Sequence, residues 1–461
     1  MYRFRQLILL GGDGAMLTLG LFAALAARYG RWPGDEFWLL LPTFTMLFGV
    51  APVVAFIIGL YDLTRAKNSW SFFQKIILAT AAWTALGIIY FYLRPPIYVR
   101  PGHAITPKTI LLLTALFGFG AIALWRYLHN RFLSFVLWQQ TVVFAGINPE
   151  SLELISLIER EPGLGFVTGG VVNQTADSIV DLPTRSTLLE LTQALSPKEI
   201  NVIALSPSAA KEPLLLKELY NQLFRHIEII DLTSFYEKIT GRIPPFTFSE
   251  SWFLANLREQ EKKMYDRFRI LVDYILAFFM GLVCACLFPF IALLIKLDSR
   301  GAIFFRQTRV GRNGRLFTIY KFRTMQSLTK EGSAELAGPR FASVNDARIT
   351  RVGQFLRKTR LDELPQCFNI LKGEMSLIGP RPERPEFVDK LTAEMPFYSL
   401  RHLLKPGLTG WAQIHRSYYG NIEENLFKLQ YDLFYLKNRG FILDCVIILR
   451  TINTLLRFAG R

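Results

Sequence analysis

Cysteine is scarce in this chain, and its placement argues against a disulfide framework. The 461 residues include four cysteines, and two of them, Cys284 and Cys286, lie inside a long apolar run. Acidic residues are also in the minority, because 37 Asp and Glu stand against 53 Lys and Arg, which gives a formal net charge of +16. The scarcity of cysteine favours a reducing, cytosol-facing environment. The excess of basic over acidic residues indicates an anionic partner, although charge alone does not choose among lipid phosphate, nucleotide and nucleic acid.

Two motifs of dinucleotide enzymes are missing. No G-x-G-x-x-G follows the first strand that we expect after Thr141, and the turn there contains Pro149, which removes an amide that a phosphate would use. No lysine has a tyrosine four places before it, as an NAD-dependent sugar-nucleotide dehydratase requires. Aromatic residues lie mostly in apolar runs and not on a basic face, which argues against nucleic acid.

Long apolar runs fill the first 130 residues. Hydrophobic residues make up 51% of the chain and the mean hydropathy is +0.26, which favours a membrane protein. Four runs each approach the roughly 20 residues that a helix needs to cross a bilayer: 7–27, 37–60, 76–93 and 109–125. Because further apolar runs follow the first, we expect an uncleaved membrane helix and not a secretion signal. Asp13, inside the first run, is expected to face a neighbouring helix or the interface.

From Thr141 the pattern changes to short apolar strands that alternate with helical stretches. The expected strands are TVVFAGI, FVTGGVV, NVIALS and IEIIDL, and the expected helices include SLELISLIER and PLLLKELYNQLFRHI. This alternation is typical of a small parallel-sheet α/β domain. We therefore expect a Rossmann-like domain without a bound dinucleotide, followed by a linker at GRIPPFTFSE, together spanning residues 136–250.

A further apolar run, residues 274–295, has basic residues on both sides. Positive charge at both ends favours a helix that enters the membrane and leaves on the same face. Pro289 would bend such a helix after Phe288, whereas an ordinary fifth crossing is the alternative. The flanking cations are Arg267, Arg269, Lys296 and Arg300. The last segment, FILDCVIILRTINTLLRFAG, is apolar but interrupted by charges, which suits a helix in the membrane interface; a buried core helix is the alternative.

An adjacent acid pair, Asp362 and Glu363, stands in a strongly basic region. Cleavage of a sugar diphosphate needs a nucleophile for one phosphorus and assistance for the anionic leaving phosphate. Asp362 is suited to the attack, and Glu363 to proton transfer or to holding a divalent cation, but two such acids also commonly begin a helix. The nearby cations favour a phosphate-rich substrate: Lys321, Arg323, Arg348, Arg351, Arg357, Lys358, Arg360 and Arg381.

Three of these cations have a suggestive local setting. Lys321 and Arg323 alternate with aromatic residues, so on one strand they would share a face and aim at one anion, unless that face is simply solvated. Arg381 lies between two prolines, and the stiff backbone suits a group that positions a nucleotide, although proline flanks also make plain turns. His402 and His415 show no metal-ligand spacing.

The motifs between residues 302 and 410 resemble, in order, those of the catalytic domain of bacterial sugar transferases, the polyprenyl-phosphate glycosyl-1-phosphate transferases. The resemblance covers residues 266–461, and more weakly the upstream architecture of the long members of that family. The matching motifs are FFRQ, VG, YKFRTM, RITRVG, LR, LDELPQ, MSLIGPRPE and KPGLTGW.

The resemblance implies the fold in three parts. Residues 1–135 would form a membrane α-helical bundle and residues 136–250 the Rossmann-like α/β domain with its linker. Residues 251–461 would form a monotopic α+β catalytic domain held by a re-entrant membrane helix. In the family that helix breaks at a Ser-Pro step, whereas here Phe288 precedes Pro289. The missing hydroxyl leaves the angle of the break open.

The resemblance also implies the reaction, which is transfer of a sugar-1-phosphate, by default hexose-1-phosphate from a UDP-sugar, to undecaprenyl or another polyprenyl phosphate. UMP would be released, in the first membrane step of exopolysaccharide or other surface-glycan biosynthesis. Asp362 would be the nucleophile that carries the phosphosugar, Glu363 would assist it, and carboxylates with phosphates suggest Mg²⁺ at both acids. The substrate-binding residues would be Lys321, Arg323, Arg348, Arg357 and Arg381.

The expected setting is the bacterial inner membrane, with several crossings and a cytoplasmic catalytic domain. The partners would be UDP-sugar, polyprenyl phosphate and membrane lipid, without nucleic acid, and association into a homo-oligomer is left open. Two other classes compete with this interpretation. A sugar-nucleotide dehydratase lacks its motifs here, and a non-enzymatic membrane regulator of polysaccharide export gives no reason for the acid pair.

Overall fold

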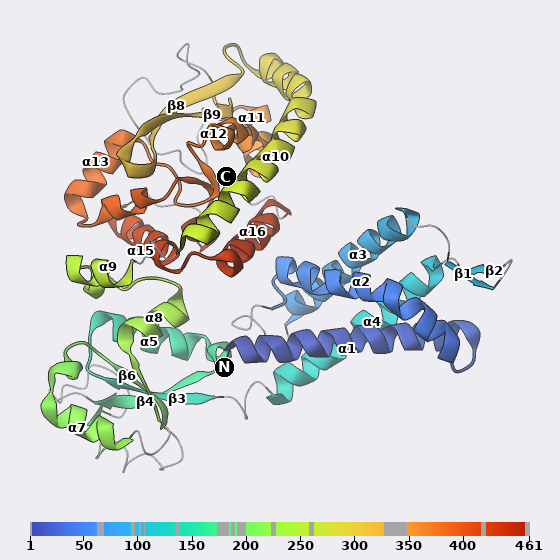
Figure 1. Ribbon diagram of the computed structural model, residues 1–461, viewed down its shortest axis with the longest axis horizontal. Helices are drawn as coiled ribbons and strands as arrows, with labels where there is room; N and C mark the ends of the chain where they lie inside the picture. Colours follow the sequence, from blue (N-terminus) through green and yellow to red (C-terminus); the bar gives the residue numbers. More distant parts are fainter. Residues whose placement is uncertain are drawn as a thin grey trace. The chain divides into compact units, whose positions relative to one another are not determined.

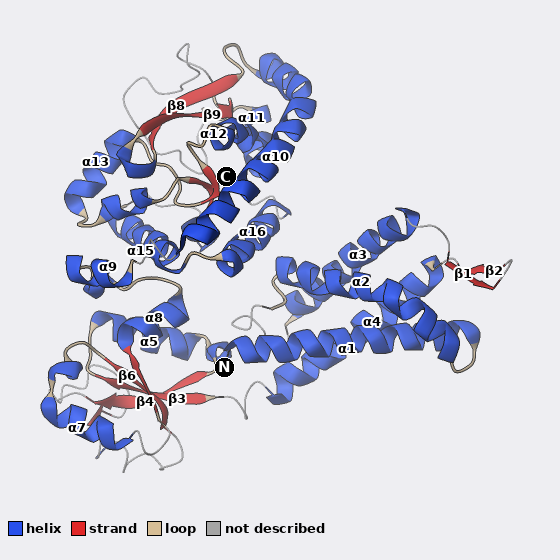
Figure 2. Ribbon diagram, in the orientation of Figure 1, coloured by secondary structure: helices blue, strands red, loops and turns tan. Residues whose placement is uncertain are grey.

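The chain divides into two compact units, Met1–Phe235 and Tyr236–Arg461. Their helices and strands are labelled in Figure 1 and coloured by type in Figure 2. The computed structural model describes residues 2–61, 69–93, 97–100, 103–105, 107–133, 139–172, 184–185, 190, 200–222, 227–257, 262–326, 348–415 and 421–456.

Four long helices form the apolar part of the first unit, and each coincides with one of the four predicted runs. Glycines let α1 and α4 approach closely, since a Cβ built at Gly20 would collide with the backbone of Gly118. The helices are α1 (Tyr2–Tyr29), α2 (Gly34–Ile58), α3 (Trp70–Leu93) and α4 (Lys108–Leu128). The hairpin of β1 (Ile97–Arg100) and β2 (His103–Ile105) lies between α3 and α4, and a π-helical turn, His129–Leu133, follows α4. All four helices are long and apolar enough to cross a membrane.

The acid inside the first apolar run is paired with an arginine of α4. The Asp13 carboxylate accepts hydrogen bonds from the Arg126 guanidinium, including Nε at 3.0 Å, and from the Tyr61 hydroxyl at 2.7 Å. Arg126 also donates to the Leu60 carbonyl at 2.7 Å. Both charged side chains are buried, where an unpaired charge would be strongly destabilising. The prediction that Asp13 faces a neighbouring helix is confirmed.

A five-stranded parallel sheet completes the first unit, as the alternating pattern predicted. The strand order is β5-β4-β3-β6-β7, and every neighbouring pair runs parallel. The strands are β3 (Gln140–Ala145), β4 (Phe166–Val172), β5 (Thr184–Arg185), β6 (Ile200–Leu205) and β7 (Glu228–Asp231). Helices α5 (Pro149–Arg160), α7 (Pro213–Gln222) and α8 (Leu232–Thr240) alternate with them. The short β5 is the strand that the sequence pattern did not predict.

The turn after β3 is shaped by packing within the domain. Gly146 has a positive φ of 88°, and a Cβ built there would collide with the Ser206 hydroxyl that follows β6. Asn148 caps α5 by accepting a hydrogen bond from the Ser151 amide at 2.7 Å. A larger residue at position 146 would therefore clash with Ser206, which explains the glycine of this turn.

The second unit mixes helices with two small sheets, which agrees with the predicted α+β class. Strands β8 (Phe304–Val310) and β9 (Leu316–Phe322) pair antiparallel, whereas β10 (Ser376–Ile378) and β11 (Gly407–Thr409) pair parallel. The helices are α9 (Glu250–Asn256), α10 (Lys263–Asp298), α11 (Arg351–Thr359), α12 (Cys367–Leu371), α13 (Pro385–Glu394), α14 (Trp411–His415), α15 (Ile422–Asn438) and α16 (Phe441–Leu456). Two longer 3₁₀ turns, Leu361–Gln366 and Tyr398–Leu403, link them.

The segment predicted as a linker packs into the second unit. Ile243 is fully buried in the core of that unit, and its amide donates to the Gln430 carbonyl at 3.2 Å. Arg242 donates to the side chain of the same glutamine at 3.2 Å. The Trp411 indole donates to the Gly241 carbonyl at 2.8 Å. These residues therefore contribute to the fold of the C-terminal unit.

Helix α10 is held to the second unit near both of its ends, and Figure 1 shows it lying along one side of that unit. Near its beginning, Asp273 accepts a hydrogen bond from the Leu377 amide at 3.0 Å. At its end, Asp298 accepts one from the Val352 amide at 2.9 Å. The helix continues through Pro289. A 36-residue helix is about 54 Å long, so these two contacts span most of its length.

An aromatic stack fixes α10 beside Pro289. The Phe288 ring lies 5.7 Å from that of Phe304, with an angle of 10° between the planes. It lies 6.3 Å from that of Phe322, at 26°, and the latter two rings stack at 5.5 Å. The residue that departs from the Ser-Pro step thus joins the proline position to both strands of the β8–β9 hairpin.

We expect replacement of Phe288 by leucine to destabilise the second unit by about 1 kcal/mol, because the stacking is lost while most apolar burial is kept. Thermal unfolding in lipid nanodiscs measures the effect. In a double-mutant cycle with Phe304→Leu, the two changes should couple by about 1 kcal/mol. Phe290→Leu is the matched control, since that ring is 67% exposed, and it should leave the unfolding temperature unchanged. Additive effects of the Phe288 and Phe304 changes would contradict the stack.

Candidate active site

The acid pair lies in a 3₁₀ turn directly after α11. Arg360 ends that helix in the left-handed conformation, with φ of 55°. A non-glycine residue pays roughly 1 kcal/mol or more for this conformation. The reversal leads into the turn Leu361–Gln366, whose first residues include Asp362 and Glu363. Both acids are buried, at 8% and 7% exposure. Local strain at Arg360 thus accompanies the burial of two neighbouring carboxylates.

Glu363 is surrounded by three cations from separate parts of the unit. Its carboxylate lies 2.8 Å from Lys321 Nζ on β9, 3.2 Å from Arg381 Nη2 after β10, and 3.7 Å from Arg360 Nη1. Burial would raise the pKa of Glu363, but Lys321 and Arg381 outweigh it and hold the pKa well below its usual range. Glu363 is therefore ionised across the physiological pH range.

Asp362 has the opposite setting. Among the described residues, no hydrogen bond to its carboxylate is found. Burial and the negative charge of Glu363 raise the pKa of Asp362 to about 6, although Lys321 and Arg357 oppose the rise. The two neighbouring acids thus differ in ionisation. Glu363 is ionised and paired with cations, whereas Asp362 has a pKa of about 6 and, within the described ranges, no hydrogen-bond donor at its carboxylate. Such a division of environments is typical of catalytic carboxylate pairs.

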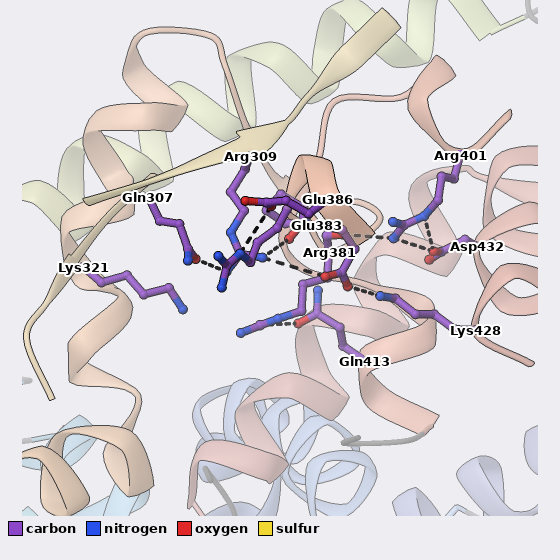
Figure 3. A network of polar contacts seen from close by, with 12 residues as sticks. Gln307, Arg309, Lys321, Arg381, Glu383, Glu386, Arg401, Gln413, Lys428 and Asp432 are labelled. Atoms are coloured by element: carbon purple, nitrogen blue, oxygen red, sulfur yellow. Dashed lines mark hydrogen bonds and ion pairs between the residues drawn. The ribbon is translucent and has the colours of Figure 1, made fainter. Parts of the chain in front are cut away.

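Arg381 connects the acid pair to a residue that the sequence did not suggest. Its Nη2 contacts Glu363, and its Nη1 donates to Oε1 of Gln413 on α14 at 3.3 Å; Figure 3 shows the arginine and the glutamine together. The amide nitrogen of Gln413 is buried, and no partner for it is found in the described part of the chain. The Arg381 side chain is 40% exposed, so its guanidinium remains accessible to a substrate. A lone glutamine carries no sequence signal for such a role.

Of two further predicted substrate-binding arginines, the structure brings Arg357 to the acid pair and gives Arg348 a different contact. Arg357 donates from Nε to the Thr324 hydroxyl at 2.9 Å, and its charge acts on Asp362. The Arg348 carbonyl accepts a hydrogen bond from the Gln326 amide at 2.9 Å. Arg348 therefore lies where the chain returns beside the end of the β8–β9 hairpin.

Arg323 is not brought to the acid pair. Strand β9 ends at Phe322, and the Arg323 side chain, 2% exposed, donates to the Ser299 carbonyl at 2.7 Å and the Arg300 carbonyl at 2.6 Å. These carbonyls follow the end of α10, where a cation is favoured by the helix dipole. The expectation that Arg323 and Lys321 share one face and one anion is therefore not met. In this geometry Arg323 holds the end of α10.

The acid pair supplies few ligands for a metal ion. Within the described ranges, no group of three or more His, Cys, Asp and Glu side chains is placed to hold one. Mg²⁺, however, is commonly bound by one or two carboxylates together with substrate phosphates and water. Asp362, whose oxygens accept no hydrogen bond within the described ranges, and the adjoining Glu363 fit that donor set. They do not fit a site made of protein ligands alone.

The acid pair lies within the part of the chain that a family model matches. A family model described as "Bacterial sugar transferase" matches residues 264–458. A UDP-N-acetylgalactosamine-undecaprenyl-phosphate N-acetylgalactosaminephosphotransferase of Aeromonas hydrophila is 40% identical over 237 residues, which cover 51% of this chain and 54% of that protein. This chain thus spans about half the length of that relative.

Two further relatives match over more of their length. Both are described as UDP-glucose:undecaprenyl-phosphate glucose-1-phosphate transferases. The protein of Klebsiella pneumoniae is 30% identical over 327 residues, 68% of this chain and 67% of its own. That of Xanthomonas campestris pv. campestris is 28% identical over 472 residues, 97% of this chain and 92% of its own. The likeness therefore extends into the N-terminal half.

We expect the Glu363→Gln change to lower the pKa of Asp362 below about 6. The change removes the negative charge that raises this pKa and leaves Lys321 and Arg381, which lower it. The protonated-carboxyl stretch in infrared difference spectra, recorded against pH, measures the midpoint, and the Asp362→Asn protein supplies the blank. Glu386→Gln, at an exposed carboxyl of α13, should leave the midpoint in place. A midpoint that stays or rises in Glu363→Gln contradicts the coupling.

Proposed function

Because this chain belongs to the bacterial sugar transferase family, we propose that it transfers a sugar-1-phosphate, by default hexose-1-phosphate, from a UDP-sugar to undecaprenyl or another polyprenyl phosphate. The observation that carries the proposal is the buried acid pair with its cations, which lies inside the matched residues 264–458. The chain is a membrane enzyme, since its family is membrane-bound and five described helices are long and apolar enough to span. The product lipid would serve exopolysaccharide or other surface-glycan synthesis.

We propose Asp362 as the nucleophile. One of its carboxylate oxygens would attack the sugar-bearing phosphorus of the UDP-sugar. The bond from that phosphorus to the bridging oxygen would break, and the electron pair would leave with UMP. The enzyme would then carry an acyl phosphate, which a phosphate oxygen of the polyprenyl phosphate would attack, restoring the carboxylate. The Asp362 oxygens accept no hydrogen bond from any residue that the structure describes, which supports this role over Glu363, whose oxygens are engaged by three cations.

The cations around Glu363 are suited to bind the diphosphate. Lys321 and Arg381 lie at the carboxylate of Glu363, next to Asp362, and so flank the position of the phosphorus under attack. Preorganised cations in a buried site stabilise the charge that develops on a leaving phosphate. Arg381, with Gln413 beside it, would bind on the nucleotide side, and Arg357 and Arg348 would add positive charge.

Mg²⁺ bound by Asp362 and Glu363 would supply further neutralisation of the diphosphate charge. Glu363 would keep its ion pair with Lys321 in this arrangement, since each carboxylate oxygen has more than one lone pair. The role of the two acids as metal ligands is a proposal, supported by the donor set alone.

We further propose that α10 is re-entrant and that the catalytic unit is cytoplasmic. The contacts at Asp273 and Asp298 tie both ends of the helix to the same folded unit, which disfavours a crossing that separates those ends. Its outer face is apolar and suits lipid. The large side chains exposed there are Ile275, Phe278, Phe279, Leu282, Val283, Phe290, Leu293 and Leu297.

The α/β domain is proposed to be Rossmann-like. Its strand order reverses between β3 and β6, as in doubly wound folds that bind dinucleotides. The tight packing of Gly146 on Ser206 supports a structural or regulatory role without a dinucleotide. Association of the protein with a second copy stays a prediction.

We expect the purified protein in nanodiscs to release UMP from a UDP-sugar when Mg²⁺ and polyprenyl phosphate are present, and a panel of UDP-sugars identifies the substrate. Without the lipid, wild type should still release UMP in a burst equal to the enzyme present, because the first half-reaction needs no acceptor. Mass spectrometry should then find the phosphosugar on the peptide that contains Asp362. Removal of Mg²⁺ by a chelator should slow both reactions.

Asp362→Asn should abolish the burst, whereas the same change at Asp389, an exposed residue of α13, should preserve it. Glu363→Gln should be impaired without complete loss. If UMP release requires the lipid even in wild type, direct displacement replaces the covalent route. No release with any UDP-sugar and lipid would reject the proposed function.

The topology is tested by cysteine labelling in intact cells. We expect cysteines placed at Arg267 and Arg300, both exposed and on either side of the apolar part of α10, to be protected from an impermeant thiol reagent until the membrane is opened. The exposed Cys286 and Cys445 are first replaced by serine. Labelling of the two positions from opposite sides would show an ordinary crossing. Pro289→Ala should raise the fraction that crosses, since alanine restores the backbone hydrogen bond and removes the bend that proline favours.

A further inference from the structure

The short segment that carries Arg381 is held along its whole backbone. The Pro380 carbonyl accepts from the Gly407 amide at 2.9 Å, and the Glu383 carbonyl accepts from the Val310 amide at 2.9 Å. The two carbonyls between them, those of Arg381 and Pro382, have no backbone partner among the described hydrogen bonds, and each instead accepts from an arginine side chain.

Arg401 donates from Nη2 to the Arg381 carbonyl at 2.9 Å. Its guanidinium is also bonded to two side chains in the core, those of Asp432 and Tyr398. Nη2 and Nε lie 2.8 and 3.0 Å from Oδ2 of Asp432 on α15, and Nη1 donates to the Tyr398 hydroxyl at 3.1 Å. Both charged side chains are almost fully buried, at 1% and 2% exposure. Figure 3 shows Arg401 and Asp432 close together, joined by dashed lines.

Arg309 performs the matching contact one residue later. Its Nη1 donates to the Pro382 carbonyl at 3.1 Å and lies 3.7 Å from the carboxylate of Glu383. That carboxylate is also bound by the buried Lys428 of α15. Two buried ion pairs, drawn together in Figure 3, therefore support the segment from the core.

We propose that Arg401 is a positioning residue for Arg381, assisted by Arg309. Arg401 holds the Arg381 carbonyl, and so directs the Arg381 guanidinium onto Glu363 and toward the nucleotide. Because Pro382 follows it, Arg381 is restricted to extended backbone, and the bonds to the Arg381 and Pro382 carbonyls hold this stiff segment in place. The guanidinium fork suits this task, because it reaches Asp432, Tyr398 and the carbonyl from one rigid plane. Asp432 fixes that plane, so it acts through Arg401.

This inference rests on the proposed function for its kinetic readout. Arg401→Lys keeps the charge but loses the fork, so its single ammonium satisfies Asp432 and releases the carbonyl. We expect the KM for the UDP-sugar to rise about tenfold or more, as for loss of one charge-assisted hydrogen bond, with a smaller fall in kcat. Asp432→Asn, which leaves Arg401 in place but unpaired, should change KM in the same direction. In an Arg381→Ala background, Arg401→Lys should add less than a twofold effect.

Arg439→Lys is the matched control. Arg439 is equally buried, with 1% side-chain exposure, and pairs with Asp266 away from the Arg381 segment. It should leave the KM unchanged. Hydrogen–deuterium exchange of the full-length protein gives a second readout that needs no activity. The peptide spanning Ser376 to Glu383 should exchange faster in Arg401→Lys and Asp432→Asn, and at the wild-type rate in Arg439→Lys.

The possible results distinguish a failure of the proposed function from a failure of the positioning role of Arg401. If wild type releases no UMP, the proposed function fails, and the exchange rates still decide whether Arg401 holds the segment. If wild type is active but Arg401→Lys equals Arg439→Lys in both KM and exchange, the inference is overturned. Full additivity of Arg401→Lys with Arg381→Ala would also overturn it, because Arg401 would then act independently of Arg381.

Discussion

The pairing of Glu363 with Lys321 and Arg381 is the interaction on which the site depends. A buried carboxylate is costly unless cations surround it. Lys321 and Arg381 come from β9 and from the segment after β10, whereas Arg360 lies three residues before Glu363. The burial of Glu363 thus requires β9 and the segment after β10 to meet at its turn. Burial and the negative charge of Glu363 raise the pKa of Asp362, whose carboxylate accepts no hydrogen bond from the part of the chain that the structure describes. The two adjacent acids therefore have different electrostatic environments.

The parts that meet at Glu363 are each supported from behind. Lys321 precedes Phe322, whose ring belongs to the stack with Phe288 of α10, so α10 and the strand that carries Lys321 are packed together. Arg381 is supported by Arg401 and Arg309. Arg323, just after β9, holds the end of α10. The residues around the acid pair are thus supported by α10 and by the core of the unit, an arrangement that favours pre-organisation of the candidate site.

Buried ion pairs recur where this chain places charge inside apolar surroundings. Asp13 and Arg126 pair between α1 and α4, and Arg401 and Asp432 pair between a 3₁₀ turn and α15. Each pair contributes little net stability compared with apolar packing, but the loss of one partner leaves the other unpaired at high cost. The pairs therefore specify which helices contact each other, and the acid of the first apolar run is explained in this way.

The sequence by itself predicted the long apolar helices, most strands of the parallel sheet and the residues of the candidate site. The lengths of the apolar runs predicted α1 to α4, and the alternation of strands and helices predicted the parallel sheet, because these patterns are local consequences of burial on one face. The LDELPQ and PRP motifs, read with the family resemblance, predicted the acid pair and Arg381. Only the tertiary structure decided how these residues are used. Strand periodicity placed Arg323 beside Lys321, but β9 ends at Phe322 and the arginine caps α10 instead. Residues such as Gln413, Arg401 and Asp432 carry no local signal, because their roles arise from contacts between segments far apart in the chain, and such contacts exist only once the unit has folded.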